Sequence, residues 1–153
     1  MKIQGLRLST PDQSGYPDSV RLLNSDTGDM LVCESKRYRS NPNPTKPNTM
    51  LRWMACYAQI APGVYPWVCK ETPKHGKCIA LNDEGQVPTT NPDVNNGNQF
   101  FATAVLIHCG FSPTWSGSAA CQTVYPDDWP YFISHFTLGQ TGIYELIDQV
   151  QTL

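Results

Sequence analysis

Short apolar segments, separated at short intervals by proline and glycine, run through most of the chain. The segments are rich in β-branched and aromatic residues, and runs of this kind between turn-forming residues are typical of β-strands. The pattern therefore predicts a mostly β, small α+β fold. The expected strands cover residues 2–9, 19–24, 29–35, 54–60, 63–70, 77–82, 101–110 and 142–148.

Two polar stretches interrupt this pattern. Residues 35–50 (SKRYRSNPNPTKPNTM) and 84–98 (EGQVPTTNPDVNNGN) switch to Asn, Pro, Thr and Gly, which favour turns and supply no core. We expect both to be long surface loops. Loops of this length in a compact domain often carry function, so they are candidates for the walls of a groove; a solvated insertion without a role is the alternative for the first.

Helical spacing occurs in the segment YPDDWPYFISHF, residues 125–136. Its aromatic and aliphatic residues recur every three to four positions, which is about one helical turn. Asp127 or Asp128 can cap the amino end, and Pro130 suits the first turn. We therefore predict a short helix that begins near Asp127. His135 lies near its far end, where a surface or C-terminal capping role is expected.

Length and charge narrow the class of protein. A chain of 153 residues suits one domain, residues 1–153. A net charge of −2, with both signs scattered, gives no footprint for nucleic acid or an anionic membrane. No apolar run reaches the roughly 18 residues of a membrane span, and the first ten residues lack the pattern of a secretion signal. We expect a protein made without its own export signal.

Six cysteines stand at positions 33, 56, 69, 78, 109 and 121. An even number permits three disulfides in an oxidising compartment but does not require them. Cys33 and Cys56 lie in apolar runs and are expected to be small core residues. His75 and Cys78 form one HxxC step without a second ligand pair at zinc-finger spacing, so no metal site is expected.

Candidate chemistry lies in VLIHCGFSPTWSGSAACQTVYP, where His108 precedes Cys121 by thirteen positions. An apolar strand delivers the histidine, and a loop of small residues delivers the cysteine. An imidazole can take the proton of a thiol and so produce a nucleophile, and backbone N–H groups in such a turn can form an oxyanion hole. A structural cysteine beside a loop histidine is the alternative.

These residues resemble the L,D-transpeptidase-like (YkuD-type) superfamily of cell-wall enzymes, most closely its short-loop phage and effector members. In that superfamily a strand ending in Ile-His-x-Gly delivers the base and a Ser-x-Gly-Cys turn delivers the nucleophile. The likeness covers roughly Ala58 to Phe136. The matching positions are Ile107, His108, Gly110, Ser118 and Cys121, with Pro62, Gly63 and Tyr65 in the upstream IAPGVYPW.

The resemblance implies a single L,D-transpeptidase-like β-sandwich or barrel with a short helix after the cysteine loop. It assigns Cys121 as nucleophile and His108 as proton carrier, without metal or cofactor. Ser118 would orient the imidazole or, alternatively, shape the loop. Tyr65 and Trp115 would flank the groove, with core packing as the alternative.

The chain also departs from the family pattern. The usual glycine before the cysteine is Ala120, which would be strained if that position needs φ > 0 and would then distort the oxyanion loop formed with Gly110. The common preceding His or Arg is Ala119, and the Arg two positions after the cysteine is Thr123. Cys109 is expected to be a core thiol, since neighbours on a strand face opposite sides; a Cys109–Cys121 disulfide is the alternative that would abolish the nucleophile.

Two function classes follow. The first is a cysteine peptidoglycan hydrolase or L,D-transpeptidase that acts on stem peptides at the bacterial cell wall or periplasm, as a phage endolysin, a virion-borne factor or a delivered toxin. The second is a non-catalytic virion or cell-wall attachment domain of the same fold. Other virion or delivery-machine proteins are further expected partners.

Overall fold

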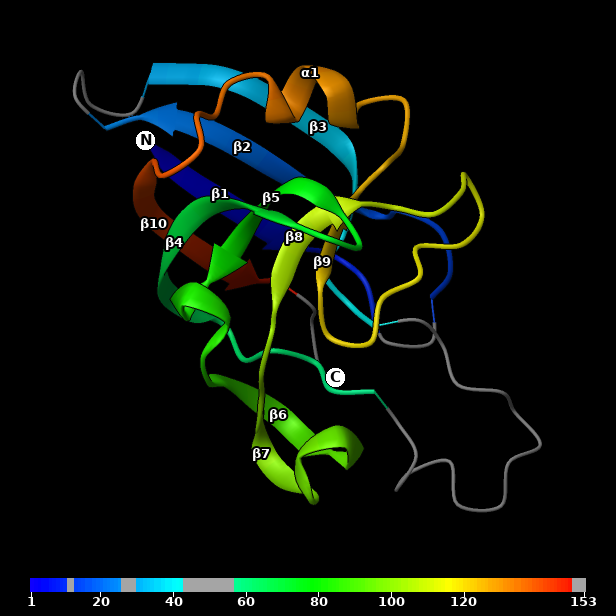
Figure 1. The fold of residues 1–153 in the computed structure, drawn as a ribbon. Coiled ribbons are helices and arrows are strands. Elements are labelled where there is room, and N and C mark those ends of the chain that lie inside the picture. Colours follow the sequence, from blue (N-terminus) through cyan, green and yellow to red (C-terminus); the bar gives the residue numbers. More distant parts are fainter. Residues whose placement is uncertain (11–12, 26–29, 43–56, 150–153) are drawn as a thin grey trace.

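The computed structural model describes residues 1–10, 13–25, 30–42 and 57–149. Its elements, in chain order, are β1 (Lys2–Arg7), β2 (Asp18–Asn24), β3 (Met30–Arg39), β4 (Gly63–Thr72), β5 (Gly76–Leu81), η1 (Asn82–Glu84), β6 (Val87–Asp93), η2 (Val94–Asn96), β7 (Gln99–Ala102), β8 (Leu106–Cys109), β9 (Gln122–Val124), α1 (Trp129–Ile133) and β10 (Thr141–Asp148). The fold is mostly β, as predicted (Figure 1).

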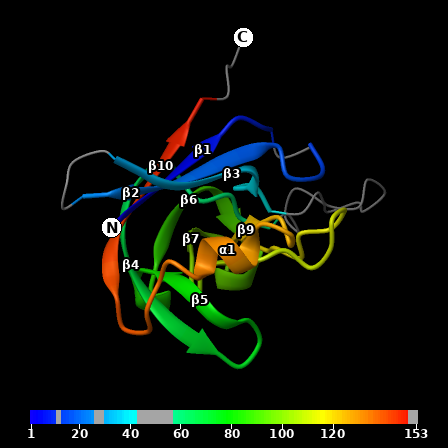
Figure 2. The same cartoon turned by 90° about the horizontal axis from the view of Figure 1, so that it is seen from above.

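Eight strands close into a barrel in the order β1-β10-β4-β5-β8-β9-β3-β2. Strand β1 runs beside β10 in parallel (Figure 2), and β8 runs parallel to β9; the other barrel pairs are antiparallel. Alternate residues of β1 and β4 are buried, which is the period expected of a strand with one face on a core. The closed sheet thus leaves one interior, which the side chains fill.

The core contains aliphatic and aromatic side chains from all around the barrel, with a hydrogen-bonded polar chain inside it. The hydroxyls of Tyr38 and Tyr144 lie 3.0 Å apart, and the Tyr144 hydroxyl donates to Oε1 of Gln122 at 3.0 Å. The amide of Gln122 donates to the carbonyl oxygen of Ser40 at 3.0 Å and to that of Ala120 at 3.4 Å. Burial of these polar groups is therefore compensated by partners.

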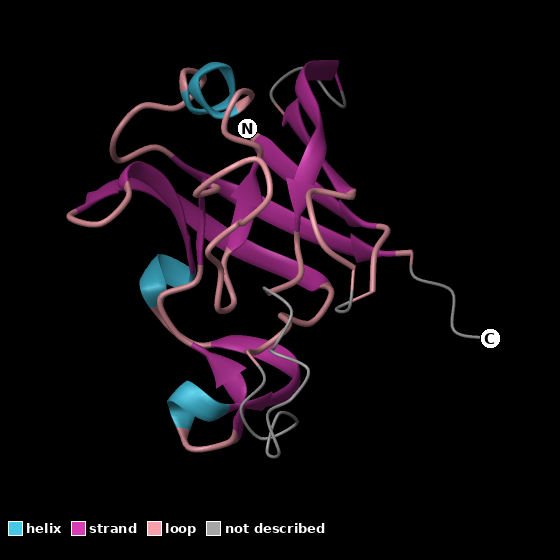
Figure 3. Ribbon diagram, turned by 90° about the vertical axis from the view of Figure 1, so that its right-hand side faces the viewer, coloured by secondary structure: helices cyan, strands magenta, loops and turns pink. Residues whose placement is uncertain are grey.

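Strands β6 and β7 form a separate two-stranded sheet below the barrel (Figure 3). The expectation of a surface loop over residues 84–98 is wrong, because this segment contains β6 and η2. Its strand pairs with β7 and also bridges Ile60 through Thr89, and such tertiary pairing overrides a turn-rich composition. The first polar stretch was also expected as a loop, but its residues 35–39 extend β3, and its residues 43–50 lie outside the described part of the chain.

The strand expected over residues 101–110 is instead two strands. Strand β7 ends at Ala102 and β8 begins at Leu106, and Ala104 between them has a φ of +54°. A residue in this region cannot continue a strand. Of the expected strand over residues 54–60, residues 54–56, including Cys56, lie outside the described part of the chain, and Ile60 forms only an isolated bridge.

Helix α1 lies next to β3 in Figure 1 and over the space between the strands in Figure 2, and its buried Phe132 belongs to the core. Pro130 stands in its first turn, as predicted. Asp128 is the N-cap residue, but its side chain does not cap the helix; instead it accepts hydrogen bonds from Arg37 and Ser35. Nδ1 of His135 lies 2.9 Å from the carbonyl oxygen of Tyr131, which confirms the C-terminal capping role. Among the described residues, no helix is long and apolar enough to cross a membrane.

Candidate active site around Cys121 and His108

The parallel strands β8 and β9 bring the two candidate residues to one region. His108 lies in β8 opposite Thr123 of β9, and Cys121 directly precedes β9. Since parallel strands start at the same end of a sheet, Cys121 lies beside the first residue of β8. The backbone N–H of Leu106 accordingly donates to the Cys121 sulfur at 3.3 Å.

His108 and Cys121 line the same pocket, of ≈ 460 Å³. Its wall is formed by the hairpin tip between β4 and β5, the end of η1, the connection between β7 and β8, strand β8 itself and the loop before β9. The lining residues are Thr72, Pro73, Lys74, His75, Glu84, Ala104, Leu106, His108, Gly117, Ala119 and Cys121. The convergence of the strand and the small-residue loop, which shared chemistry requires, is thus present.

Cys121 is a free thiol at the edge of this pocket, so the alternative of a Cys109–Cys121 disulfide does not hold. Its S–H donates to the carbonyl oxygen of Ala104 at 3.6 Å. Burial raises the pKa of the thiol to about 11, against a smaller lowering effect from the hydrogen bond with Leu106. At neutral pH the sulfur therefore carries its proton in the unliganded protein.

His108 is held by its own strand. The side chain is 2% exposed, and Nδ1 lies 2.8 Å from the carbonyl oxygen of Cys109. Because a carbonyl oxygen only accepts hydrogen bonds, Nδ1 carries the proton and Nε2 keeps its lone pair. Burial lowers the pKa of His108 to about 4, so the ring is a neutral proton acceptor at neutral pH.

In the unliganded protein, the side chains of His108 and Cys121 form hydrogen bonds with other groups and not with each other. Among the described residues, the partners of Cys121 are Ala104 and Leu106, and the partner of the His108 ring is Cys109. Proton transfer between the two requires the thiol to leave Ala104 and turn to the free Nε2 of His108. Catalytic hydrogen bonds often form only once a substrate is bound.

The loop between His108 and Cys121 is shaped by close packing. A methyl group at Gly110 would collide with the hydroxyl of Tyr16, which donates to the carbonyl oxygen of Ser112 at 2.7 Å. Gly117 has a φ of +74° and lies against the ring of Phe111. Ser118 is buried and its hydroxyl donates to the carbonyl oxygen of Cys121 at 2.5 Å. Its observed contact is thus the loop-shaping one, not a contact with the imidazole.

Ala120 does not have the positive φ that would have strained it; the pocket-lining residues with positive φ are Glu84, Ala104 and Gly117. Ala120 is instead buried at 9% exposure. Within the described part of the chain, no hydrogen-bond acceptor takes the backbone N–H of Cys121.

The remaining expected site residues lie apart from the pocket. Tyr65 is buried in the core and its hydroxyl donates to the carbonyl oxygen of Ala61 at 2.5 Å, so core packing describes it. Trp115 is half exposed and is not part of the pocket lining. Thr123 is fully buried. Cys109 is half-buried rather than a core thiol, and its sulfur donates to the carbonyl oxygen of Gly110 at 3.3 Å.

Several pocket residues were not predicted from the sequence, and three of them lie close to the candidate pair. His75 stacks on His108, Lys74 lies in the pocket wall, and Ala104 accepts the hydrogen bond of the Cys121 thiol. Pro73 and Gly76 signal a hairpin turn between two apolar runs, which places His75 at a hairpin tip. Nothing local in the sequence tells which part of the barrel that tip reaches.

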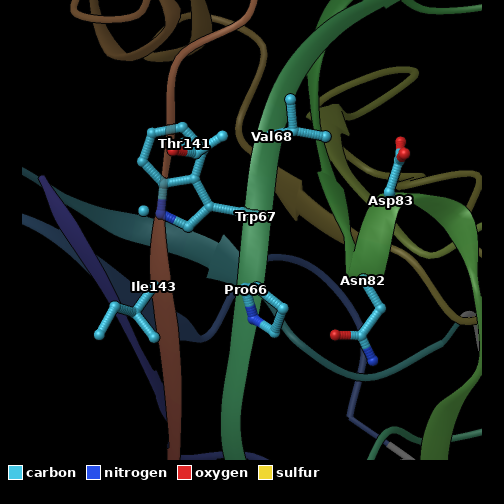
Figure 4. Close-up of a pocket in the computed structure, with 8 residues that line it drawn as sticks. Pro66, Trp67, Val68, Asn82, Asp83, Thr141 and Ile143 are labelled. Carbon is cyan, nitrogen blue, oxygen red and sulfur yellow. The ribbon is translucent and has the colours of Figure 1, made fainter.

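A second hollow of ≈ 800 Å³ lies on the outside of the barrel between β4, β10 and η1 (Figure 4). Its residues are Pro66, Trp67, Val68, Asn82, Asp83, Thr141, Gly142 and Ile143. The lining holds no nucleophile or base, apart from the carboxylate of Asp83, which forms an ion pair with Lys70 at 2.9 Å. Candidate chemistry is therefore concentrated in the pocket of Cys121.

Comparisons with known proteins leave the family undecided, because no protein-family model, no curated protein and no solved structure matches this chain.

Proposed function

We propose that the protein is a cysteine-dependent enzyme of the L,D-transpeptidase-like fold that acts on peptidoglycan stem peptides, as a hydrolase or as a transpeptidase. One observation carries the proposal: a free thiol and a neutral imidazole with an unprotonated Nε2 line one pocket. The choice of stem peptides rests on the resemblance of IHCG and GSAACQTV to that superfamily. The site of action would be the bacterial cell wall or periplasm, where a virion could carry the enzyme.

The residues present suffice for acyl transfer. Nε2 of His108 takes the proton of Cys121 while the sulfur attacks the scissile carbonyl carbon. The backbone N–H of Cys121 donates to the oxyanion that develops. The imidazolium then protonates the leaving amine, such as the nitrogen of D-alanine, and a thioester remains. Water or an amine, deprotonated by His108, attacks the thioester and restores the thiol.

The buried, neutral resting pair fits this sequence of proton transfers. In the unliganded protein the pKa of His108 is lowered to about 4 and that of Cys121 is raised to about 11, so an ion pair is not formed before substrate arrives. Charge appears only as the sulfur attacks. Substrate that displaces the Cys121 thiol from Ala104 would start the reaction.

The test is mass spectrometry of purified muropeptides incubated with protein under reducing conditions. Wild-type protein should release D-alanine from tetrapeptides or form new cross-links. Cys121→Ala and Cys121→Ser should abolish both products, because an unactivated hydroxyl does not replace the sulfur. His108→Ala should lower the rate by about 10² or more. Cys33→Ser is the control, since Cys33 lies in the core away from the pocket.

The attachment-domain alternative predicts no change in the muropeptides. The observation in its favour is that the Cys121 thiol is hydrogen-bonded to Ala104 and has a raised pKa. Wild-type protein that leaves tetrapeptide, pentapeptide and cross-linked muropeptides unchanged, yet sediments with isolated cell walls, would replace the enzyme with a binding domain. Cys121→Ala should then sediment as wild type does.

A further inference from the structure

The tip of the β4–β5 hairpin lies against the candidate base. The imidazole of His75 stacks on that of His108 with ring centroids 3.9 Å apart and an interplanar angle of 20°. His75 comes from a different pair of strands than His108, and both side chains line the pocket of Cys121. Such a contact fixes the plane of a ring without touching a reacting atom.

We propose that His75 is a positioning residue, which holds the His108 ring in the plane that directs Nε2 into the pocket. The inference rests on the proposed function and deepens it. Two contacts fix the orientation of the His108 ring. The hydrogen bond from Nδ1 to the Cys109 carbonyl oxygen sets the direction of one ring edge, and the stack on His75 limits rotation of the ring about that direction. Neither alone fixes the orientation of an imidazole.

The hairpin tip is built to hold His75 in place. Thr72 and Gly76 are paired across the hairpin, and the backbone N–H of His75 donates to Oγ1 of Thr72 at 3.1 Å. Gly76 has a φ of +64° with open space around it, as a three-residue hairpin loop requires. The loop between the two is therefore short and well supported.

The ring of His75 has no other assigned task. Among the described residues, its ring nitrogens have no hydrogen-bond partner, and its contact is the face-to-face stack. Ala119, from the cysteine loop, also lies in the pocket wall.

The pKa of His108 depends on the charged and titratable groups around its ring. His75 and Lys74 face it from the hairpin tip, Glu84 from η1, and Cys121 from the cysteine loop. Glu84 is paired with Lys70 at 2.7 Å. Burial is the largest cause of the lowered pKa of His108, and His75 and Lys74 lower it further.

Substitution of His75 separates stacking from proton transfer. His75→Ala removes the ring, so kcat on muropeptides should fall on the order of 10-fold, with KM within about twofold, because misplacement of a base affects the chemical step. His75→Phe keeps a flat ring that cannot carry a proton, and it should retain kcat within about threefold. His135→Ala, in the turn that follows α1 and outside the pocket lining, is the matched histidine control.

An NMR titration of labelled histidine side chains tests the positioning without any turnover. His108→Gln identifies the His108 signal. In His75→Ala the His108 ring gains solvent and loses a neighbouring cation, so its pKa should rise from about 4 toward 6.5. His75→Phe should keep most of the lowering, and His135→Ala all of it.

The outcomes distinguish the two proposals. Wild-type kcat and an unchanged His108 titration in His75→Ala would overturn the positioning role. A His75→Phe variant as slow as His75→Ala would replace positioning with proton transfer through His75. Inactive wild-type protein, with the His108 pKa still raised by His75→Ala, would remove the proposed function while the ring support stands.

Discussion

Nδ1 of His108 lies 2.8 Å from the carbonyl oxygen of Cys109, the next residue in the same strand. A candidate base is usually oriented by a side chain from elsewhere in the fold. Here the backbone of β8 performs that task, so the tautomer of His108 is set wherever this strand end is formed. The polar loop residue Ser118 is free to hold the cysteine turn instead.

The first prediction concerns stability against pH. The folded-state pKa of His108 is lowered from 6.5 to about 4, so the unfolded chain binds this proton more readily than the folded protein does. The lowered pKa of His108 therefore contributes to the free energy of unfolding. This contribution is fully present above pH 6.5 and is lost as the pH falls through about 4. It amounts to roughly 3 kcal/mol in the free energy of unfolding.

Urea unfolding at pH 7 and near pH 4 measures this contribution. His108→Gln, which does not titrate, should show a smaller loss of stability over the same range than the wild type. Equal losses in the two proteins would mean that His108 is not buried as a neutral ring.

The second prediction concerns the reactivity of Cys121 in the unliganded protein. Because burial raises the pKa of the thiol to about 11, alkylation by iodoacetamide should be slow at pH 7. The rate should then rise about tenfold per pH unit, since only the thiolate reacts. Peptide mapping after timed alkylation follows Cys121 separately from the other cysteines. A rate that is already at its plateau near neutral pH would show a preformed thiolate.

The third prediction contrasts two alanines. Ala104 has a φ of +54° and is exposed, so Ala104→Gly relieves backbone strain and should be neutral or stabilising by up to about 1 kcal/mol. Ala120 is buried without positive φ. Ala120→Gly therefore removes a packed methyl group and should cost about 1 kcal/mol. Thermal unfolding of both variants checks the contrast; the reverse order would place the strained turn at Ala120.

The fourth prediction contrasts two glycines with positive φ. Gly117 has a φ of +74° and lies against Phe111, whereas Gly139 has a φ of +87° with open space around it. Both alanine variants should lose about 1 to 2 kcal/mol from backbone strain. Gly117→Ala must also displace the Phe111 ring, so it should lose more stability and should disturb the cysteine loop. Equal midpoints of thermal unfolding would show that Phe111 yields without cost.

Some strands were predictable from the sequence, as β1, β4 and β10 show. Their residues either alternate between apolar and polar or form a continuous apolar run, and such a pattern can be recognised within the segment itself. Strand β6 was not, because its residues VPTTNPD form a strand only through pairing with β7 and the bridge to Ile60. The break at Ala104 was missed for a related reason: an alanine gives no signal of a left-handed backbone.

The same division holds for the site. The pairing of His108 with Cys121 in one pocket followed from a strand and a small-residue loop that are close in sequence. The stack of His75 on His108 depends on where a distant hairpin meets the barrel, and no spacing within TPKHGK encodes that. The condition for strain at Ala120, a positive φ, is not met, because the left-handed residue of this loop is Gly117.

Barrel closure has a consequence for the order of events during folding. The wall is completed when β10 pairs with β1, which joins Lys2 to Ile143. Gln122, next to Cys121, accepts a hydrogen bond from Tyr144 of that last strand. Contacts between residues so far apart along the chain form slowly. The hydrogen bond between Gln122 and Tyr144, which supports the cysteine turn from inside the barrel, can therefore form only after almost the whole described chain has been synthesised. A partly synthesised chain would contain the Cys121 thiol without a complete site around it.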